Sequence, residues 1–312
     1  MLSRTADHLF WMSRYIERAE NLARLLDVTW QMSLVPQSLE SANQSWSAIL
    51  ALNSLESSFS EKYPETNAEN LLRFMVSDLD NQASIMSCLR MARENAHAVR
   101  GTITSEMWET MNSTWLEART MSFEQILNNG IGDFFEWVKM RSSLSRGTTL
   151  GTLLQDDAYN FIRTGTLLER ADNTARILDV KYHVLRPHRE EGATDFYQWG
   201  ALLRSVSAFE VYRKVYRHVI TPDRVAELLI LHKDMPRSLL FCVAGVLKNL
   251  EVIAHRGSAE TMRKAGLLHS QLRYARIEDI LEHGLHIWLT EFMDNIYLLG
   301  GCISEDFLVS PS

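Results

Sequence analysis

The sequence has few residues that interrupt helices. Its 312 residues include only 14 glycines and six prolines. Because these two residues most often end or kink a helix, their scarcity favours long helices. No segment shows a convincing alternation of apolar and polar residues with period two, which is typical of a half-buried strand. We therefore expect an all-α protein.

Cysteine is also scarce. The three cysteines, Cys88, Cys242 and Cys302, are widely spaced and form no Cys-x-x-Cys pair. This spacing offers neither a disulfide framework nor a zinc site, and it suits a reducing compartment. Arg4 and Asp7 interrupt the first apolar stretch, as they would not in a secretory signal. The sequence therefore predicts a cytoplasmic protein.

Long apolar runs and excess positive charge are missing as well. The longest apolar run, residues 238–247, is shorter than the ~18 residues that a membrane span needs. The formal net charge is −7, whereas general affinity for nucleic acid requires a concentrated basic surface. We predict that the protein binds neither membrane nor nucleic acid.

Motifs that carry known chemistry are absent from the sequence. There is no glycine-rich phosphate loop, no His-Glu-x-x-His and no Gly-x-Ser-x-Gly. Ser84 and Cys88, like Ser238 and Cys242, lie four residues apart in apolar segments, which indicates core lining rather than activated nucleophiles. We predict no cofactor, and the sequence leans away from an enzyme.

One stretch of the sequence occurs twice. Residues 17–28, Glu-Arg-Ala-Glu-Asn-Leu-Ala-Arg-Leu-Leu-Asp-Val, return at 169–180 as Glu-Arg-Ala-Asp-Asn-Thr-Ala-Arg-Ile-Leu-Asp-Val, with nine of twelve positions identical. The offset is 152 residues (169 − 17). It is 153 between Trp46 and Trp199 (199 − 46).

The same correspondence continues to the end of the chain. Asn95 matches Asn249, and Gly130 matches Gly284, each at an offset of 154 (284 − 130). An offset that drifts by so little indicates an internal duplication with small insertions. We predict one domain over residues 1–312, built from copy one at 1–148 and copy two at 149–312.

Apolar spacing and cap residues predict about five helices in each copy. In copy one these are 5–33, 44–60, which closes before Pro64, 68–100 with a break near Asp80, 104–117, and a last helix from the capping box Ser122–Gln125 to Gly147. In copy two they are 153–186, 195–219, 222–232, 235–256 and 272–299. Pro36 is expected to end the first helix, and residues 187–192 are expected to form a polar loop. Thr221-Pro222 and Ser258 are expected to start helices. Asp80 and Asp234 are expected to act as N-caps. We expect a helical bundle whose two copies share one core and are related by a pseudo-twofold axis.

The repeated stretch carries a polar stripe. Glu17, Glu20, Arg24 and Asp27 lie at i, i+3, i+7 and i+10, on one face of a helix. The candidate site consists of Glu17, Arg18, Glu20, Asn21, Arg24 and Asp27 in copy one, and of Glu169, Arg170, Asp172, Asn173, Arg176 and Asp179 in copy two. Because these residues persisted while flanking apolar residues diverged, we expect them to be buried, paired or functional.

Three interpretations of the stripes stay open. They can form a buried ion-pair network between the copies, which fixes register more than it stabilises. They can line a polar pocket, in which Arg18, Arg24, Arg170 and Arg176 hold an anionic or amide-bearing ligand. A two-metal carboxylate site would require two Glu-x-x-His motifs. Only one exists, at residues 94–97, so we predict no metal.

Two further polar clusters are secondary candidates. Arg93, Glu94, Asn95 and Arg100 form the first, which we expect on a solvated or inter-helix face. Arg204, Arg213 and Arg217 form the second, interleaved with tyrosines. Arginine side chains that cover a tyrosine-lined core surface explain this second pattern better than phosphate binding does.

Several motifs together resemble the bacterial alpha-E family, an all-helical group. They are the stretch 168–180, Tyr-Gln-Trp-Gly-Ala-Leu-Leu-Arg-Ser-Val-Ser-Ala-Phe-Glu at 197–210, Pro-Arg-Ser-Leu at 236–239, and Ala-Arg-Glu-Asn-Ala at 92–96 followed by Arg100 and Glu106-x-Trp-Glu. The resemblance covers essentially the whole chain. Copy one departs from copy two at Tyr15 and Glu20, where copy two has Leu167 and Asp172, which leaves the equivalence of the two sites open.

The resemblance implies a role beside other proteins. Members are typically encoded next to circularly permuted ATP-grasp proteins, transglutaminase-like proteins and sometimes a proteasome-like peptidase. It implies an accessory or binding subunit that works with an ATP-grasp ligase, and with a transglutaminase-like protein as a further partner, in the synthesis, attachment or processing of a small peptide or amide-linked product. The alternatives are an enzyme that transfers acyl or aminoacyl groups with the stripe carboxylates, and a structural adaptor. Assembly into a homo-oligomer is left open.

Substitution of Arg176 separates these interpretations. If the stripe is a buried network, Arg176→Ala leaves carboxylates unpaired and lowers the free energy of unfolding by several kcal/mol. If the stripe lines an open pocket, the same change leaves the melting temperature nearly unmoved and abolishes ligand or partner binding. Thermal unfolding of the purified variant distinguishes the two outcomes.

Overall fold

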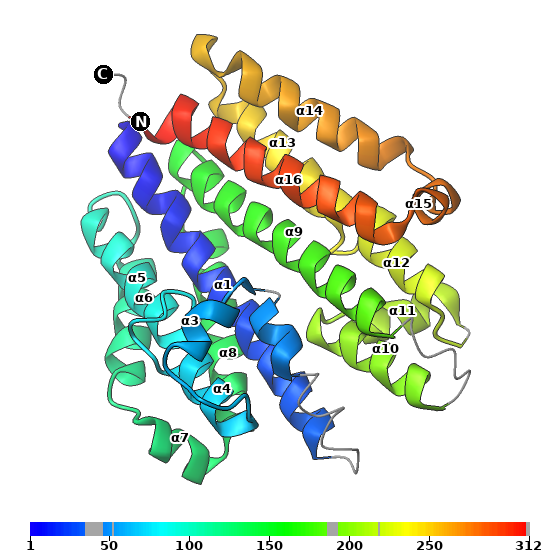
Figure 1. Ribbon diagram of the computed structural model, residues 1–312. Coiled ribbons are helices and arrows are strands. Elements are labelled where there is room, and N and C mark those ends of the chain that lie inside the picture. The colour runs from blue at the N-terminus through cyan, green and yellow to red at the C-terminus, as the bar shows by residue number, and fades with distance from the viewer. Residues whose placement is uncertain (35–45, 52, 186–192, 218, 310–312) are drawn as a thin grey trace. The chain divides into compact units, whose positions relative to one another are not determined.

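The computed structural model describes residues 1–34, 46–51, 53–185, 193–217 and 219–309, and these residues form helices and turns without a strand (Figure 1). The predicted all-α class is therefore confirmed. The expected helix end at Pro36 and the expected loop 187–192 lie outside the described residues.

The chain forms two compact units. The N-terminal unit comprises Trp11–Leu154, and the C-terminal unit comprises Met1–Phe10 with Gln155–Ser312. The division after Leu154 lies close to the predicted boundary between the copies. The shared core and the pseudo-twofold axis stay predictions.

In the N-terminal unit, α6 packs between α5 and α8. The elements of this unit are α1 (Ser3–Ser33, whose first turns belong to the other unit), α3 (Glu56–Ser60), α4 (Ala68–Val76), α5 (Ile85–Ala98), α6 (Ser105–Ala118), α7 (Phe123–Asn129) and α8 (Ile131–Thr152). Helix α5 packs against α4 and α6, and α8 packs against α6 and α7. Leu26, Trp46, Phe74 and Phe135 are buried, so the unit has a hydrophobic core of its own.

Helix α9 is the centre of the C-terminal unit. The elements are α9 (Asp157–Leu185), α10 (Ala193–Ser205), α11 (Phe209–Tyr216), α12 (Pro222–Leu231), α13 (Leu239–Ile253), η1 (Arg256–Ser258), α14 (Ala259–Tyr274), α15 (Ile277–His283), α16 (Leu285–Ile303) and η2 (Ser304–Leu308). Helices α10, α12, α13 and α16 all pack against α9 (Figure 1). A Cβ at Gly245 would lie 2.5 Å from Cδ1 of Leu167, so this glycine allows α13 to approach α9 closely.

Two predicted helices, 44–60 and 195–219, are wrong because each breaks at a serine. Ser54 and Ser207 both have a φ of 54°. The residue after each serine donates its amide to the carbonyl five residues earlier: Leu55 to Leu50 at 3.0 Å, and Ala208 to Leu203 at 2.7 Å. A residue with a left-handed backbone, followed by a hydrogen bond over five residues, is a common helix ending. The sequence hid these breaks because no glycine or proline marks them.

The last predicted helix of each copy breaks at a glycine, and the one predicted at 272–299 in copy two also begins inside α14, which ends at Tyr274. Gly130 separates α7 from α8 with a φ of 102° and a ψ of 108°. Gly284 separates α15 from α16 with a φ of 100° and a ψ of 112°. A residue with a Cβ rarely adopts this backbone conformation, so both breaks need glycine. Gly147, the predicted end of this helix in copy one, lies inside α8, so that predicted helix end is wrong.

Some of the predicted helix starts are confirmed. Ser122 and Gln125 form the expected capping box, with hydrogen bonds of 3.2 and 2.9 Å, at the start of α7. Pro222 occupies the first turn of α12, and Ser258 precedes α14. Short polar side chains and proline suit these positions because the first backbone amides of a helix lack partners within it.

The predicted N-caps at Asp80 and Asp234 are wrong. The side chain of Ser84 caps α5 and that of Ser238 caps α13, accepting from backbone amides at 3.1 and 3.0 Å. Asp80 instead binds Lys62 at 2.9 Å, and this hydrogen bond lowers the pKa of its carboxyl. Both serines are fully buried, as expected for residues that line the core. They also cap the helices that follow them.

Helices of the two units begin at matching positions. Each of α4, α5, α6, α7 and α8 starts 154 residues before α12, α13, α14, α15 and α16, respectively (for α6 and α14, 259 − 105). The same order of helices therefore recurs, with the same spacing, in both units.

The glycine breaks generate a stability prediction. We expect Gly130→Ala and Gly284→Ala each to lower the free energy of unfolding by about 1–3 kcal/mol, because alanine is strained at a φ near +100°. Chemical denaturation of each variant measures the change.

Gly132→Ala is the matched control, since Gly132 lies within α8 and a Cβ there would have no atom within 4 Å. Alanine favours the helix over glycine by about 1 kcal/mol, so this variant should be at least as stable as the parent. Equal effects at positions 130 and 132 would contradict the argument.

Candidate functional site

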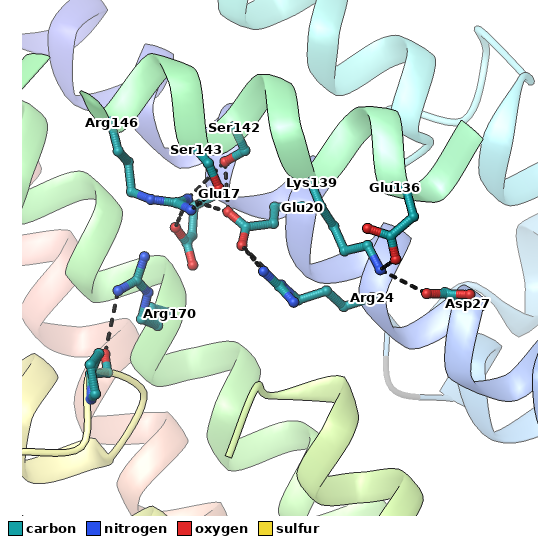
Figure 2. A network of polar contacts seen from close by, with 11 residues as sticks. Glu17, Glu20, Arg24, Asp27, Glu136, Lys139, Ser142, Ser143, Arg146 and Arg170 are labelled. Carbon is teal, nitrogen blue, oxygen red and sulfur yellow. Dashed lines mark hydrogen bonds and ion pairs between the residues drawn. The ribbon is translucent and has the colours of Figure 1, made fainter. Parts of the chain in front are cut away.

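The polar stripe of copy one lies on α1 and is buried. Glu20 has no exposed surface, and Glu17 and Asp27 are 1% and 6% exposed. One oxygen of Glu20, Oε1, accepts from Arg24 Nε at 2.9 Å. The other, Oε2, accepts from the Ser142 hydroxyl at 2.6 Å and from Arg146 (Figure 2). Both oxygens of this buried carboxylate are therefore satisfied, as burial requires.

Helix α8 supplies the partners of this stripe. Arg146 also reaches Glu17 at 3.6 Å and donates to the Ser142 hydroxyl at 2.9 Å. One turn or two away, Lys139 binds Asp27 at 2.8 Å (Figure 2). Positions 139, 142 and 146 fall on one face of a helix, at i, i+3 and i+7. In the N-terminal unit the stripe is thus a closed ion-pair network between α1 and α8.

The equivalent stripe of copy two is more open. On α9, Arg176 Nε donates to Asp172 at 2.8 Å, and the two side chains are 40% and 21% exposed. Asp179 lies 2.8 Å from Nδ1 of His286, whose side chain is 52% exposed. Asn173 is half-buried. We use the name α9 face for the side chains of Asp172, Arg176 and Asp179 on α9 together with that of His286 on α16.

The Glu-Arg pair that begins the repeated stretch of copy two, Glu169 and Arg170, is buried on α9. Glu169 and Arg170 are 5% and 7% exposed. Arg170 donates to the Pro236 carbonyl at 3.3 Å, in the turn before α13. This bond links α9 to the start of α13, so Arg170 serves packing within the C-terminal unit.

The two stripes differ because α8 and α16 differ. At the offset of 154, the positions of Lys139, Ser142 and Arg146 on α8 are taken on α16 by Met293, Ile296 and Gly300. A Cβ at Gly300 would lie 3.7 Å from Leu168, so α16 approaches α9 closely at this position. Copy two therefore keeps the repeated charges, whereas the polar residues that α8 presents to them in copy one are replaced on α16 by apolar and small residues.

The remaining stripe residues have separate environments. The guanidinium of Arg18 lies 5.7 Å from the centre of the Tyr15 ring, a cation–π distance. Copy two has Leu167 at the position of Tyr15, so this contact belongs to copy one alone. Asn21 is buried on α1.

The first secondary cluster does not form one site. Arg93 donates to Asn112 at 3.2 Å, binds Glu94 at 2.8 Å and lies over the Trp108 ring, which joins α5 to α6. Asn95 is buried and donates to the Met91 carbonyl of its own helix at 2.7 Å. Arg100 is exposed beyond the end of α5. The residues therefore face different directions.

The second secondary cluster covers aromatic side chains. The guanidinium of Arg204 lies 4.3 Å from the centre of the Phe209 ring. Arg213 and Arg217 are exposed at the end of α11. Tyr216 in the same helix donates to Glu227 at 2.8 Å, and its pKa is raised by burial and by this hydrogen bond. The arginines lie over or beside a tyrosine-containing surface and do not converge on a ligand.

Sequence reasoning missed the partners supplied by α8 and α16. Lys139, Ser142, Arg146 and His286 are not repeated between the copies, so a comparison of the copies passes over them. Their only signal was the helical spacing of the three α8 residues. Buried carboxylates need cations as partners, so a stripe of carboxylates expected to be buried predicts cations on a neighbouring helix.

The described residues also bear on metal binding and on membrane insertion. Among them, no group of three or more histidine, cysteine, aspartate or glutamate side chains could hold a metal ion. None of the helices in the described part of the chain combines the length and apolarity needed to cross a membrane.

Comparison with known proteins identifies one family model over the whole chain. Alpha-E, described as a predicted alpha-helical domain with a conserved ER motif, matches residues 1–308. This chain contains a Glu-Arg pair at 17–18 and another at 169–170. Both pairs begin the repeated stretch described above.

Similar proteins are found among curated mycobacterial sequences. Uncharacterised proteins of Mycobacterium bovis and of two strains of Mycobacterium tuberculosis are 22% identical over 316 aligned residues, which cover 94% of this chain. The chain spans only 35% of the length of these relatives. No solved structure matches the chain.

The closed network predicts a large stability effect in copy one. We expect Arg146→Met to lower the free energy of unfolding by about 3 kcal/mol, because Glu20 and Glu17 stay buried without this cation. In the double variant Glu20→Gln with Arg146→Met, the loss should be smaller than the sum of the single losses. Denaturant titration of the four proteins completes the cycle.

Arg176→Ala is the matched comparison in copy two, where the arginine is 40% exposed. It should leave the melting temperature nearly unchanged. A loss at Arg176 as large as that at Arg146 would show that both stripes are structural in the same sense, against our description of them.

Proposed function

Because the chain belongs to the Alpha-E family, we propose that it is a helical accessory subunit that binds an ATP-grasp ligase and assists in the synthesis, attachment or processing of a small peptide or amide-linked product. Support for the partner comes from the resemblance, since members are typically encoded beside circularly permuted ATP-grasp proteins. Support for binding rather than catalysis comes from the unequal construction of the two stripes.

The α9 face is the proposed binding surface. Arg176 presents a guanidinium to solvent while Asp172 orients it at 2.8 Å. A planar guanidinium binds carboxylate or phosphate through two parallel hydrogen bonds. An ATP-grasp ligase activates a carboxylate with ATP, so its substrate and cofactor both carry such groups. His286, beside Asp179, adds an imidazole ring to the same face.

The N-terminal unit has a structural part in this proposal. The carboxylate of Glu20 contacts Arg24, Ser142 and Arg146 and has no exposed surface. A group held in this way is inaccessible to a substrate. The alternative of an enzyme that transfers acyl groups with the stripe carboxylates therefore has less support in copy one than a network that holds α1 on α8.

We also infer that the two units descend from one duplicated unit. In support, five pairs of helices start at one constant offset. Gly130 and Gly284 share their unusual backbone angles, and Ser54 and Ser207 share a φ of 54°. Loss of the α8 cations in copy two, or their gain in copy one, then allowed the two stripes to take different roles.

A reconstituted assay tests the proposal. The purified chain is added to the ATP-grasp protein encoded beside its gene, and both complex formation and the amide product are measured. We expect a stable complex and a change in the yield or identity of the product. Arg176→Ala should weaken the complex by on the order of tenfold, the effect of one charge-assisted bidentate contact.

Arg263→Ala is the control, because Arg263 is also exposed and paired, with Glu260, but lies on α14. It should bind like the parent. Absence of both a complex and a product change would refute the accessory role. A complex that is insensitive to Arg176 would preserve the partnership and exclude the α9 face.

A further inference from the structure

A pocket of about 390 Å³ lies in the N-terminal unit between α7, α8 and the connection from α6 to α7. It is lined by Thr120, Met121, Gln125, Ile126, Asn129, Gly130, Asp133, Phe134 and Trp137. This volume lies in the range of pockets that bind small molecules. We call it the α7–α8 pocket.

The backbone break at Gly130 shapes this pocket. With its φ of 102°, Gly130 connects α7 directly to α8 and brings Asp133 into the first turn of α8. A Cβ at Gly130 would lie 3.6 Å from Oδ2 of Asp133, so the carboxylate lies above the bare glycine. In the described part of the chain, the Asp133 carboxylate has neither a hydrogen bond nor an ion pair.

An aromatic pair forms one wall of the α7–α8 pocket. The rings of Phe134 and Trp137 are stacked, with centroids 5.9 Å apart and planes 20° apart. Trp137 is held in place by a hydrogen bond of 2.9 Å from its Nε1 to Glu117. The pocket thus combines a fixed aromatic wall with an available carboxylate and the carboxamides of Gln125 and Asn129.

The C-terminal unit has a pocket of the same chemistry. It measures about 280 Å³ and is lined by Leu268, Gln271, Leu272, Trp288, Glu291, Phe292 and Asn295, from α14 and α16. Here too the lining includes one carboxylate, two carboxamides and a stacked aromatic pair, Trp288 and Phe292, with centroids 5.8 Å apart. We call it the α14–α16 pocket.

The two pockets share positions although their residues differ. Phe134 and Trp137 correspond, at the offset of 154, to Trp288 and Glu291. The carboxylate comes from Asp133 in one pocket and from Glu291 in the other. The same kinds of group therefore line both pockets, although most of them come from positions that do not correspond.

We propose that the α7–α8 pocket, and with it the α14–α16 pocket, binds the lysyl side chain of a peptide. A carboxylate pairs with a protonated amine, an aromatic wall receives the apolar stem and the cation, and carboxamides bind the flanking peptide groups. Neither pocket is lined by lysine or arginine, which disfavours a phosphate or carboxylate ligand. This inference stands apart from the proposed function, because binding of the peptide needs no ligase.

The test uses N-acetyl-lysine N-methylamide as the probe and N-acetyl-norleucine N-methylamide, which lacks the amine, as the comparison. Each is titrated into protein labelled at its tryptophan indoles, and indole N–H signals are followed by NMR. Trp137→Phe and Trp288→Phe assign the two reporting signals. We expect both signals to shift with the lysyl probe, and the norleucine analogue to bind about tenfold more weakly or worse.

Variants identify the group that recognises the amine. Asp133→Asn keeps the shape of the side chain and should weaken binding of the lysyl probe at Trp137 about tenfold, with no change at Trp288. Glu109→Gln removes the same charge from an exposed position of α6 outside the pocket, and should bind like the parent. Thermal unfolding checks that both variants are folded.

Three outcomes would overturn the proposal. They are an unmoved Trp137 signal at every probe concentration, equal binding of the lysyl and norleucine probes, and equal binding by Asp133→Asn and the parent. Reconstitution with the ligase can fail while these titrations succeed, so the two proposals are judged separately.

Discussion

The buried carboxylate of Glu20 is the constraint on which the N-terminal unit depends. A charge without access to water requires hydrogen-bond donors at both oxygens, and on α1 Arg24 donates to Oε1. Ser142 and Arg146 donate to Oε2 from α8. A shift of α8 by one residue would rotate these side chains by about 100°. The ion pairs thus fix the register of α8 on α1 in a way that apolar contacts would not.

The C-terminal unit holds the corresponding helices together by close packing instead. Gly300 faces Leu168, and Gly245 leaves room for Leu167, so α9 is enclosed by α13 and α16 through apolar contacts. The repeated stretch also contributes polar contacts to this packing, since Arg170 donates to the Pro236 carbonyl and Asp179 contacts His286 of α16. The side chain of Arg176 is 40% exposed, whereas Glu20 in the N-terminal unit is wholly buried in its network.

Much of the fold follows from the sequence, since apolar spacing and caps such as Ser122 and Pro222 are local signals. The breaks at Ser54 and Ser207 were missed because they depend on a left-handed φ, which a serine in the sequence does not indicate. The candidate stripe was found through its repetition. Its partners Lys139 and Arg146 were not, since they come from another helix and are not repeated. Long-range pairing of this kind is decided by packing, which local patterns do not encode.

The offsets between the units also locate where the chain has changed in length. The offset is 152 at Glu17 and Glu169 (169 − 17), 153 at Ser54 and Ser207 (207 − 54), and 154 from the start of α4 to the start of α8. On the duplication proposed above, the insertions or deletions that separate the units lie before α4. From there onward, the starts of successive helices are separated by the same number of residues in both units, although the helices themselves end at different positions. On the same proposal, a foreign peptide inserted for labelling belongs in the connections before α4, where the two units differ in length.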